Sequence, residues 1–227
     1  MSIKATPLGH SRILSVGTYR PKRAVPNSEI VDRIESTDEW IQQRTGIESR
    51  GFAGDDETVI SMAKAACEMA LKRAKLSIED IDTVILSTIS YPFQAPSAAT
   101  ELINELGNPK AAAFDISAAC AGFCYGVAMA SDLVRSGTSR NVLVIGVEKL
   151  SDYTDPDDRA TAFIFADGAG AVIIGQSDQP RIGQTIWGSD ADSRDAITLT
   201  PSFLDYKKNP EKGVGKLGWP NISQQGQ

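Results

Sequence analysis

Two near-continuous apolar runs, residues 83–89 and 141–147, have the length and composition of strands buried on both faces of a sheet. Further strand-like runs cover residues 12–18, 111–117 and 171–175. Segments with helical spacing separate these runs, and Thr58–Lys75 places its apolar residues on one face. Strands that alternate with helices predict an α/β fold with a largely parallel sheet.

Capping residues mark where several helices should begin. Asn27 can cap a helix that runs to Ile34, and Thr37 or Asp38 can cap the next one, which ends near Gly46. A further helix is expected from Ser97 to Leu106. After Pro180 the pattern changes: residues 181–188 resemble one more strand, and residues 190–227 predict a long loop.

Cys120 lies where a strand gives way to a helix, in the run Asp115-Ile-Ser-Ala-Ala-Cys120-Ala-Gly-Phe-Cys124-Tyr-Gly126. We expect the chain to bury this thiol at the start of an inner helix that extends to Val134. The unpaired N–H groups and the positive end of the helix dipole would stabilise negative charge on the sulfur, as a nucleophile requires. A small hydrophobic residue in a core helix is the alternative interpretation.

The Cys120 segment resembles the active-site region of β-ketoacyl-acyl-carrier-protein synthase III, a thiolase-fold condensing enzyme. Two other segments are similar to the same family and occur in the same order. They are Ser36-Thr-Asp-Glu-Trp40-Ile-Gln-Gln-Arg44-Thr-Gly-Ile47 and Asp155-Pro-Asp-Asp-Arg159-Ala-Thr-Ala-Phe-Ile-Phe165-Ala-Asp-Gly168-Ala-Gly170-Ala171. The resemblance covers almost the whole chain and implies a thiolase-like α/β fold.

The resemblance also implies roles for individual residues. Cys120 would be the catalytic nucleophile that accepts an acyl group from acyl-CoA. The predicted coenzyme A contacts are Ser36, Trp40, Arg44 and Arg159. The predicted acyl-pocket residues are Ala95, Leu150 and Phe165. Without the family, Trp40 would be a half-buried indole beside a solvated arginine, Arg159 would pair with Asp155 or Asp158, and Leu150 and Phe165 would be core residues.

The family implies a second stage, in which malonyl-acyl-carrier protein loses carbon dioxide and its carbanion attacks the acyl-enzyme to start a fatty-acid chain. Members use a histidine and an asparagine of their C-terminal half for this stage. The only histidine here is His10, which precedes the first expected strand. We therefore expect residues 1–180 to form the N-terminal half, residues 181–227 to begin an incomplete C-terminal half, and this chain alone to be defective in condensation.

Composition narrows the classes of partner. The net charge of −6 argues against a nucleic-acid-binding protein. Three irregularly spaced cysteines do not indicate a disulfide framework and favour the reducing cytoplasm. Residues 111–130 are nearly all apolar or small, but Asp115 and two glycines favour a buried strand and helix over a membrane span.

Cofactor and partner expectations follow from the same residues. Cys124 lacks the further ligands of a tetrahedral metal site, so we predict no metal and assign Cys124 to packing. Acyl-CoA is expected as a substrate and not as a resident cofactor, and the family implies a homodimer. Two alternatives stay open: a related polyketide-type ketosynthase, and a non-catalytic half-fold fragment that supplies an interaction subunit.

Overall fold

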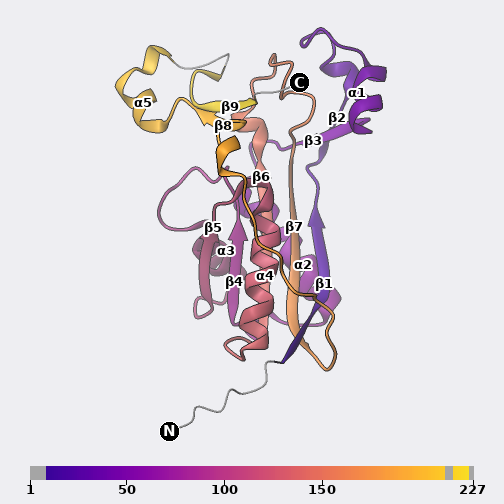
Figure 1. Cartoon of the computed structure of the whole chain (residues 1–227), viewed down its shortest axis with the longest axis vertical. Coiled ribbons are helices and arrows are strands. Elements are labelled where there is room, and N and C mark those ends of the chain that lie inside the picture. The colour runs from indigo at the N-terminus through magenta and orange to yellow at the C-terminus, as the bar shows by residue number, and fades with distance from the viewer. Residues whose placement is uncertain (1–8, 213–216, 225–227) are drawn as a thin grey trace. The chain divides into compact units, whose positions relative to one another are not determined.

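The computed structural model describes residues 9–212 and 217–224, which fold into two compact units (Figure 1). Unit 1 comprises the described parts of Met1–Arg20, Thr58–Glu148 and Gly168–Ile186. Unit 2 comprises the described parts of Pro21–Glu57, Lys149–Asp167 and Trp187–Gln227. Neither unit has a boundary at residue 180, and the domain limit expected there stays a prediction.

A five-stranded sheet with the order β1-β7-β6-β4-β5 forms the centre of unit 1. Its strands are β1 (His10–Tyr19), β4 (Thr83–Ser87), β5 (Ala112–Ile116), β6 (Asn141–Lys149) and β7 (Asp167–Ser177). β4 pairs in parallel with both β5 and β6, whereas β1 pairs antiparallel with β7. The α/β prediction with a mainly parallel sheet is confirmed.

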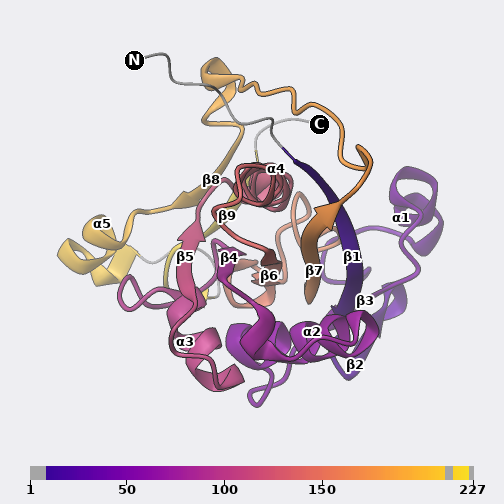
Figure 2. The same ribbon diagram turned by 90° about the horizontal axis from the view of Figure 1, so that it is seen from below.

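Helices cover both faces of this sheet, which explains the continuous apolar runs of its central strands. Figure 2 shows α4 (Gly122–Arg135) on one face and α2 (Val59–Ala74) and α3 (Ala98–Leu106) on the other. Every residue of β4 is buried as a result. Alternate side chains of a strand point to opposite faces, so a strand between two helical layers needs apolar residues at every position.

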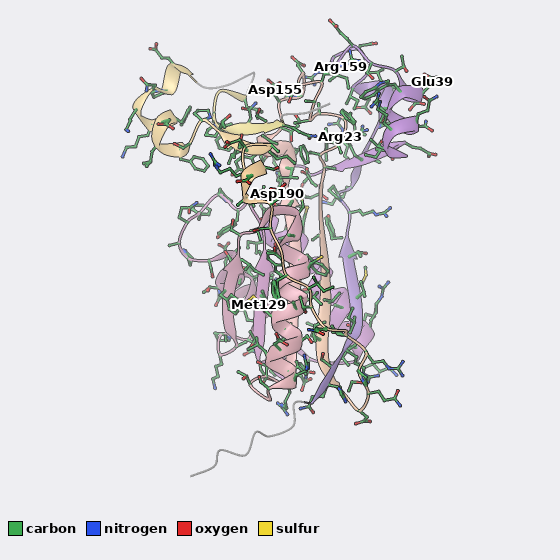
Figure 3. The ribbon with its side chains drawn as sticks, in the orientation of Figure 1. Arg23, Glu39, Met129, Asp155, Arg159 and Asp190 are labelled. Carbon is green, nitrogen blue, oxygen red and sulfur yellow. The ribbon has the colours of Figure 1, made fainter. Side chains whose placement is uncertain are left out.

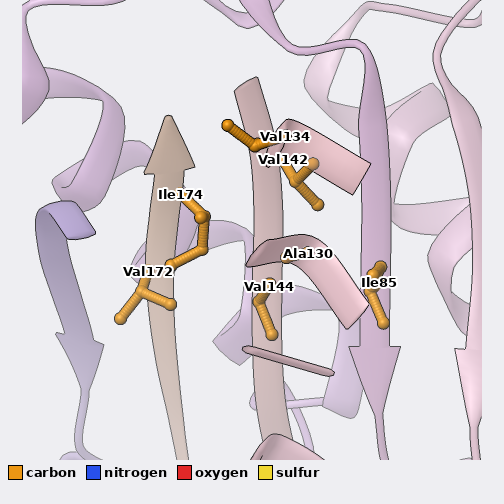
Figure 4. Packing of buried hydrophobic residues seen from close by; sticks show 7 residues of the cluster. All are labelled: Ile85, Ala130, Val134, Val142, Val144, Val172 and Ile174. Carbon is orange, nitrogen blue, oxygen red and sulfur yellow. The ribbon is translucent and has the colours of Figure 1, made fainter. Parts of the chain in front are cut away.

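The core on the α4 side consists of small and β-branched residues (Figure 4). Ala130 and Val134 of α4 pack against Ile85 of β4 and Val144 of β6, and this cluster is completed by Val142, Val172 and Ile174. All of these residues are at most 5% exposed. The alanine allows α4 to approach the sheet closely, and the branched side chains fill the space between the strands.

The helix starts predicted near Thr37, Thr58 and Ser97 are confirmed, whereas the cap predicted at Asn27 is wrong. Thr37 accepts a hydrogen bond from the Trp40 N–H at the start of α1 (Asp38–Thr45), and Gly46 ends this helix with a φ of 71°. Thr58 and Ser97 cap α2 and α3 in the same way. Among the described residues, no helix combines the length and apolar character needed to cross a membrane.

Unit 2 has its own small core. β2 (Arg23–Pro26) pairs antiparallel with β3 (Ser49–Phe52), and β8 (Ile197–Thr200) with β9 (Asn221–Gln224). Ile30, Ile34 and Ile41 form the buried cluster with Val25 and Ala162, and Trp40 and Phe163 pack against it. A hydrogen-bonded chain fixes α1: Arg50 donates to Asn27 Oδ1 at 2.5 Å, and Asn27 Nδ2 donates to Asp38 at 2.6 Å.

Three of the predicted secondary-structure assignments differ from the structure. The strand predicted at 181–188 is wrong: no strand forms there, and Ile186 is 95% exposed because no neighbouring strand covers it. The loop predicted for 190–227 contains β8, β9 and the short helix α5 (Phe203–Lys208). The helix predicted from Asn27 to Ile34 is reduced to a 3-10 turn, Asn27–Glu29, followed by turn residues.

Candidate functional site

Cys120 lies between β5 and α4, in the 3-10 turn Ala119–Ala121. Its side chain is exposed, so the prediction of a buried thiol is wrong. The turn lies on the surface of unit 1, and the buried positions of α4 begin only at Gly122 and continue through Gly126 and Ala130. The predicted strand-to-helix junction is confirmed, and it presents the thiol to solvent.

The start of α4 differs from the start of the other α-helices. Thr37, Thr58, Ser97 and Ser202 cap α1, α2, α3 and α5 with their side chains. Within the described residues, neither the Cys120 turn nor α4 receives a side-chain cap, because alanines occupy both cap positions, Ala118 and Ala121. The first N–H groups beside Cys120 are therefore left without the usual side-chain acceptor and can stabilise an anion.

The backbone immediately before Cys120 has an unusual conformation. Ala119 has a φ of 43°, in the left-handed region that residues with a Cβ rarely adopt. Such a residue costs about 1–2 kcal/mol, and residues of this kind concentrate at functional sites. The sharp turn at Ala119 brings Cys120 to the N-terminal end of α4.

Neighbouring elements of unit 1 hold this turn in place. A Cβ on Gly122 would lie 1.9 Å from the Ser87 Oγ, so the first turn of α4 packs directly on the end of β4. Asp115 of β5 accepts hydrogen bonds of 2.7 Å from the Ala98 and Ala99 N–H groups at the start of α3. The end of β4 and the start of α3 are thereby tied to the elements that carry the nucleophile.

The other two cysteines differ in exposure. Cys124 lies in the first turn of α4 and is exposed like Cys120, which overturns its assignment to packing. Met129, labelled on the same helix in Figure 3, is only partly buried. Cys67 is fully buried in α2, and burial raises the pKa of its thiol far above the ordinary value.

Trp40, Arg44 and Arg159 come together in unit 2. The Arg44 Cζ lies 4.9 Å and the Arg159 Cζ 5.7 Å from the centroid of the Trp40 ring. Phe163 packs edge-on against the same indole, with ring centroids 5.2 Å apart and an interplanar angle of 77°. Two exposed guanidinium groups beside one half-buried indole can bind an aromatic base and its phosphates.

Arg159, labelled in Figure 3, is held in part by the backbone of another segment of unit 2. It donates to the Glu35 carbonyl at 2.9 Å, whereas Asp158 accepts hydrogen bonds from Ala160 and Thr161. Next to Glu35, the Ser36 Oγ is buried and has no hydrogen-bond partner among the described residues. A buried hydroxyl without a partner is costly, so Ser36 is suited to hydrogen-bond a ligand.

The predicted acyl-pocket residues are divided between the two units, and His10 lies on an edge strand. Leu150 and Phe165 are half-buried in unit 2, and Ala95 is exposed in unit 1, so their assignment to an acyl pocket stays a prediction. His10 is the first residue of β1 and pairs with Ser177. β1 and β5 form opposite edges of the sheet, so His10 does not lie on the strand next to the nucleophile.

Glu148 was missed by the sequence interpretation. It follows the buried run 141–147 in β6 and accepts hydrogen bonds from Ile89 N–H at 2.9 Å and from the hydroxyl groups of Thr88 and Ser90. Burial raises the pKa of this carboxyl, and the hydrogen bonds from Ser90, Ile89 and Thr88 oppose that rise. The sequence signal for Glu148 was an acidic residue directly after the apolar run 141–147.

Comparison with known families supports the predicted resemblance. The family model described as 3-oxoacyl-[acyl-carrier-protein (ACP)] synthase III matches residues 114–191, which include Cys120 and Arg159. A β-ketoacyl-[acyl-carrier-protein] synthase III of Streptomyces coelicolor is 49% identical over 223 residues, with 96% of this chain and 65% of that protein covered. One from Kocuria rhizophila is 47% identical, with 97% and 67% covered. The chain therefore spans about two thirds of these relatives' length.

Solved structures have the same fold. The priming β-ketosynthase of the R1128 polyketide biosynthetic pathway superposes with a TM-score of 0.92 at 40% identity, covering 99% of this chain and 66% of its own. A 3-oxoacyl-(acyl carrier protein) synthase III from Pseudomonas aeruginosa superposes with a TM-score of 0.81 at 30% identity, covering 95% and 65%. The prediction of a thiolase-like α/β fold is confirmed.

Proposed function

Because the chain belongs to the β-ketoacyl-acyl-carrier-protein synthase III family, we propose that Cys120 accepts an acyl group from acyl-CoA. The observation that carries this proposal is the exposed thiol at the uncapped start of α4. The Cys120 thiolate attacks the thioester carbonyl, a new thioester forms on the sulfur, and coenzyme A leaves as a thiolate that takes up a proton. The Cys120 N–H is a candidate donor to the oxyanion of this step.

The cluster around Trp40 is proposed to bind the nucleotide end of coenzyme A. The indole offers a surface for the adenine ring, Arg44 and Arg159 offer charge-assisted hydrogen bonds to phosphate, and Ser36 offers a hydroxyl. Coenzyme A is then a substrate that enters and leaves, and no resident cofactor or metal takes part.

The whole protein is proposed to condense the acyl group with malonyl-acyl-carrier protein, releasing carbon dioxide and forming a β-ketoacyl product. This chain supplies the nucleophile for this reaction, and His10 on the far edge strand is not proposed to assist it. A homodimer is expected, and the β5 edge strand is a surface on which a second copy could pair. We place the protein in the cytoplasm, with no nucleic-acid or membrane partner.

A priming ketosynthase of a polyketide pathway is the second candidate function. The TM-score of 0.92 with the R1128 enzyme favours it, and its first half-reaction on Cys120 would be the same. The acyl-CoA and the acceptor carrier protein used by the whole protein discriminate between the two. The alternative of a non-catalytic interaction subunit requires that Cys120 takes up no acyl group.

Replacing both Arg44 and Arg159 with alanine should weaken coenzyme A binding at least about tenfold, since each hydrogen bond to a charged group contributes roughly 1.5–3 kcal/mol. Both arginines are exposed, so the fold should survive. The measurement is the dissociation constant by calorimetry for coenzyme A and for pantetheine, which lacks the nucleotide. Only coenzyme A binding should weaken.

Arg23→Ala is the matched control, because Arg23 is an exposed arginine of the same unit that pairs with Glu29 at 2.7 Å. It should leave both ligands unaffected. Equal weakening of coenzyme A and pantetheine binding, or no change in either, would contradict the nucleotide site at Trp40.

A further inference from the structure

The residues that follow β4 are held by three carboxylates from three other elements of unit 1. Glu148 of β6 binds Thr88, Ile89 and Ser90, as described above. Glu101 of α3 accepts a hydrogen bond from the Tyr91 hydroxyl, and Asp115 of β5 binds the N–H groups of Ala98 and Ala99. The segment 88–99 is thus fixed at its start, near its middle and at its end.

The start of this segment adjoins the turn that carries Cys120. Ser87 is the last residue of β4, and its Oγ occupies the space where Gly122 would carry a Cβ. On the β6 side, a Cβ on Gly146 would lie 3.3 Å from the Phe123 ring, two residues before Glu148. The first turn of α4 therefore packs on the two strand ends that Glu148 connects.

Glu148 makes these hydrogen bonds at an energetic cost. Burial raises its pKa, which means that the ionised carboxylate is destabilised in its site relative to water. Buried charged groups are often replaceable by apolar residues without loss of stability. A carboxylate that accepts from one backbone N–H and two hydroxyls is better suited to fixing the conformation of residues 88–90 than to stabilising the fold.

We propose that Glu148 is a positioning residue for Cys120: it fixes residues 88–90, and with them the surface of β4 on which the Cys120 turn packs. Glu148 acts through Ser87 and Gly122 and does not touch the acyl group. The functional importance of this positioning role rests on the proposed acyl transfer by Cys120. The test below measures alkylation of Cys120 and does not use acyl-CoA.

The test compares alkylation rates of Cys120 and Cys124 by iodoacetamide in the full 227-residue chain, resolved by peptide mass spectrometry. Both thiols are exposed, so Cys124 is an internal reference. Glu148→Ala should lower the Cys120 rate about fivefold relative to Cys124, because the sulfur loses its alignment with the helix N-terminus. Glu148→Gln keeps one acceptor for the Ile89 N–H but loses the other carboxylate oxygen, so its Cys120 rate should lie between those of the wild type and Glu148→Ala.

Asp80→Ala is the matched control. Asp80 is also a hydrogen-bonded carboxylate of unit 1, but it accepts from Ser77 at the opposite end of β4. Asp80→Ala should leave the ratio of the Cys120 and Cys124 alkylation rates unchanged, even if it lowers the melting temperature as much as Glu148→Ala does. Equal Cys120 rates in the wild type and both Glu148 variants would overturn the proposal. If Glu148→Ala does not fold, Glu148→Gln decides alone: a Cys120 rate clearly below that of the wild type supports the positioning role, and an unchanged rate overturns it.

Incubation of the same proteins with acetyl-CoA separates this inference from the proposed function. A wild-type chain that is alkylated at Cys120 but never acylated would defeat the acyl transfer, while the rate ratio would still decide the role of Glu148. A wild type that is acylated, with Glu148→Ala unimpaired in both reactions, would defeat only the positioning role.

Discussion

Replacing Gly17 with alanine should destabilise unit 1 by about 3 kcal/mol or more, at the upper end of the usual cost of overpacking. A Cβ at this position of β1 would lie 2.0 Å from the Ala66 carbonyl oxygen and 2.6 Å from the Ala70 nitrogen. Both are backbone atoms of α2, so no side-chain rotation can relieve the clash and the helix must move away from β1. The Ser15 hydrogen bond to the Ala70 carbonyl, 2.7 Å long, would be lost with it.

Urea unfolding followed by circular dichroism measures this loss, and Gly170→Ala is the control. Gly170 lies on the neighbouring strand β7, opposite Thr18, and a Cβ there meets no atom within 4 Å. Its replacement should change the free energy of unfolding by less than about 0.5 kcal/mol. Similar losses for the two variants would mean that α2 does not approach β1 as closely as the structure has it.

Replacing Gly122 with alanine should cost about 2 kcal/mol and slow Cys120 alkylation about fivefold. The new methyl group would lie 1.9 Å from the Ser87 Oγ and 3.1 Å from the Ser87 Cβ. Ser87 is only 4% exposed, so its hydroxyl has little room to rotate away. The first turn of α4 should therefore move, and Cys120 with it.

A double-mutant cycle with Ser87→Ala identifies the clash. Removing the hydroxyl removes the 1.9 Å clash and leaves the 3.1 Å contact with the Ser87 Cβ, which a shift of a few tenths of an ångström can relieve. Gly122→Ala should recover at least half of its lost stability and reactivity in the Ser87→Ala background. Strict additivity of the two substitutions would contradict the direct contact between α4 and β4.

Local signals predicted much of the fold. Continuous apolar runs predicted β4 and β6, because burial on both faces requires apolar residues at every position. Thr58 and Ser97 marked helix starts that the structure confirms. The signals failed after residue 180, where Ile186 and Trp187 gave an apolar run that no partner strand covers. Pairing between segments as distant as β8 and β9 leaves no periodic trace in either segment.

Local sequence signals predicted some residues of the candidate site and missed those that depend on contacts between distant segments. Trp40 and Arg44 are neighbours on one helix, so their proximity followed from spacing, whereas Arg159 could be assigned only through the family resemblance. The junction at Cys120 was visible in its small residues, but the exposure of the thiol depends on which face of α4 the sheet covers. The left-handed Ala119 and the hydrogen bonds of Glu148 depend on tertiary contacts that no local pattern records.

Acylation of Cys120 is the central claim, and the intact mass of the chain after incubation with short and branched acyl-CoAs tests it most directly. We expect a mass gain of one acyl group, located by peptide mapping on Cys120 and absent from Cys120→Ala, with Cys124 unmodified. No gain with any acyl-CoA, or a gain that persists in Cys120→Ala, would contradict the assignment of Cys120 as the nucleophile.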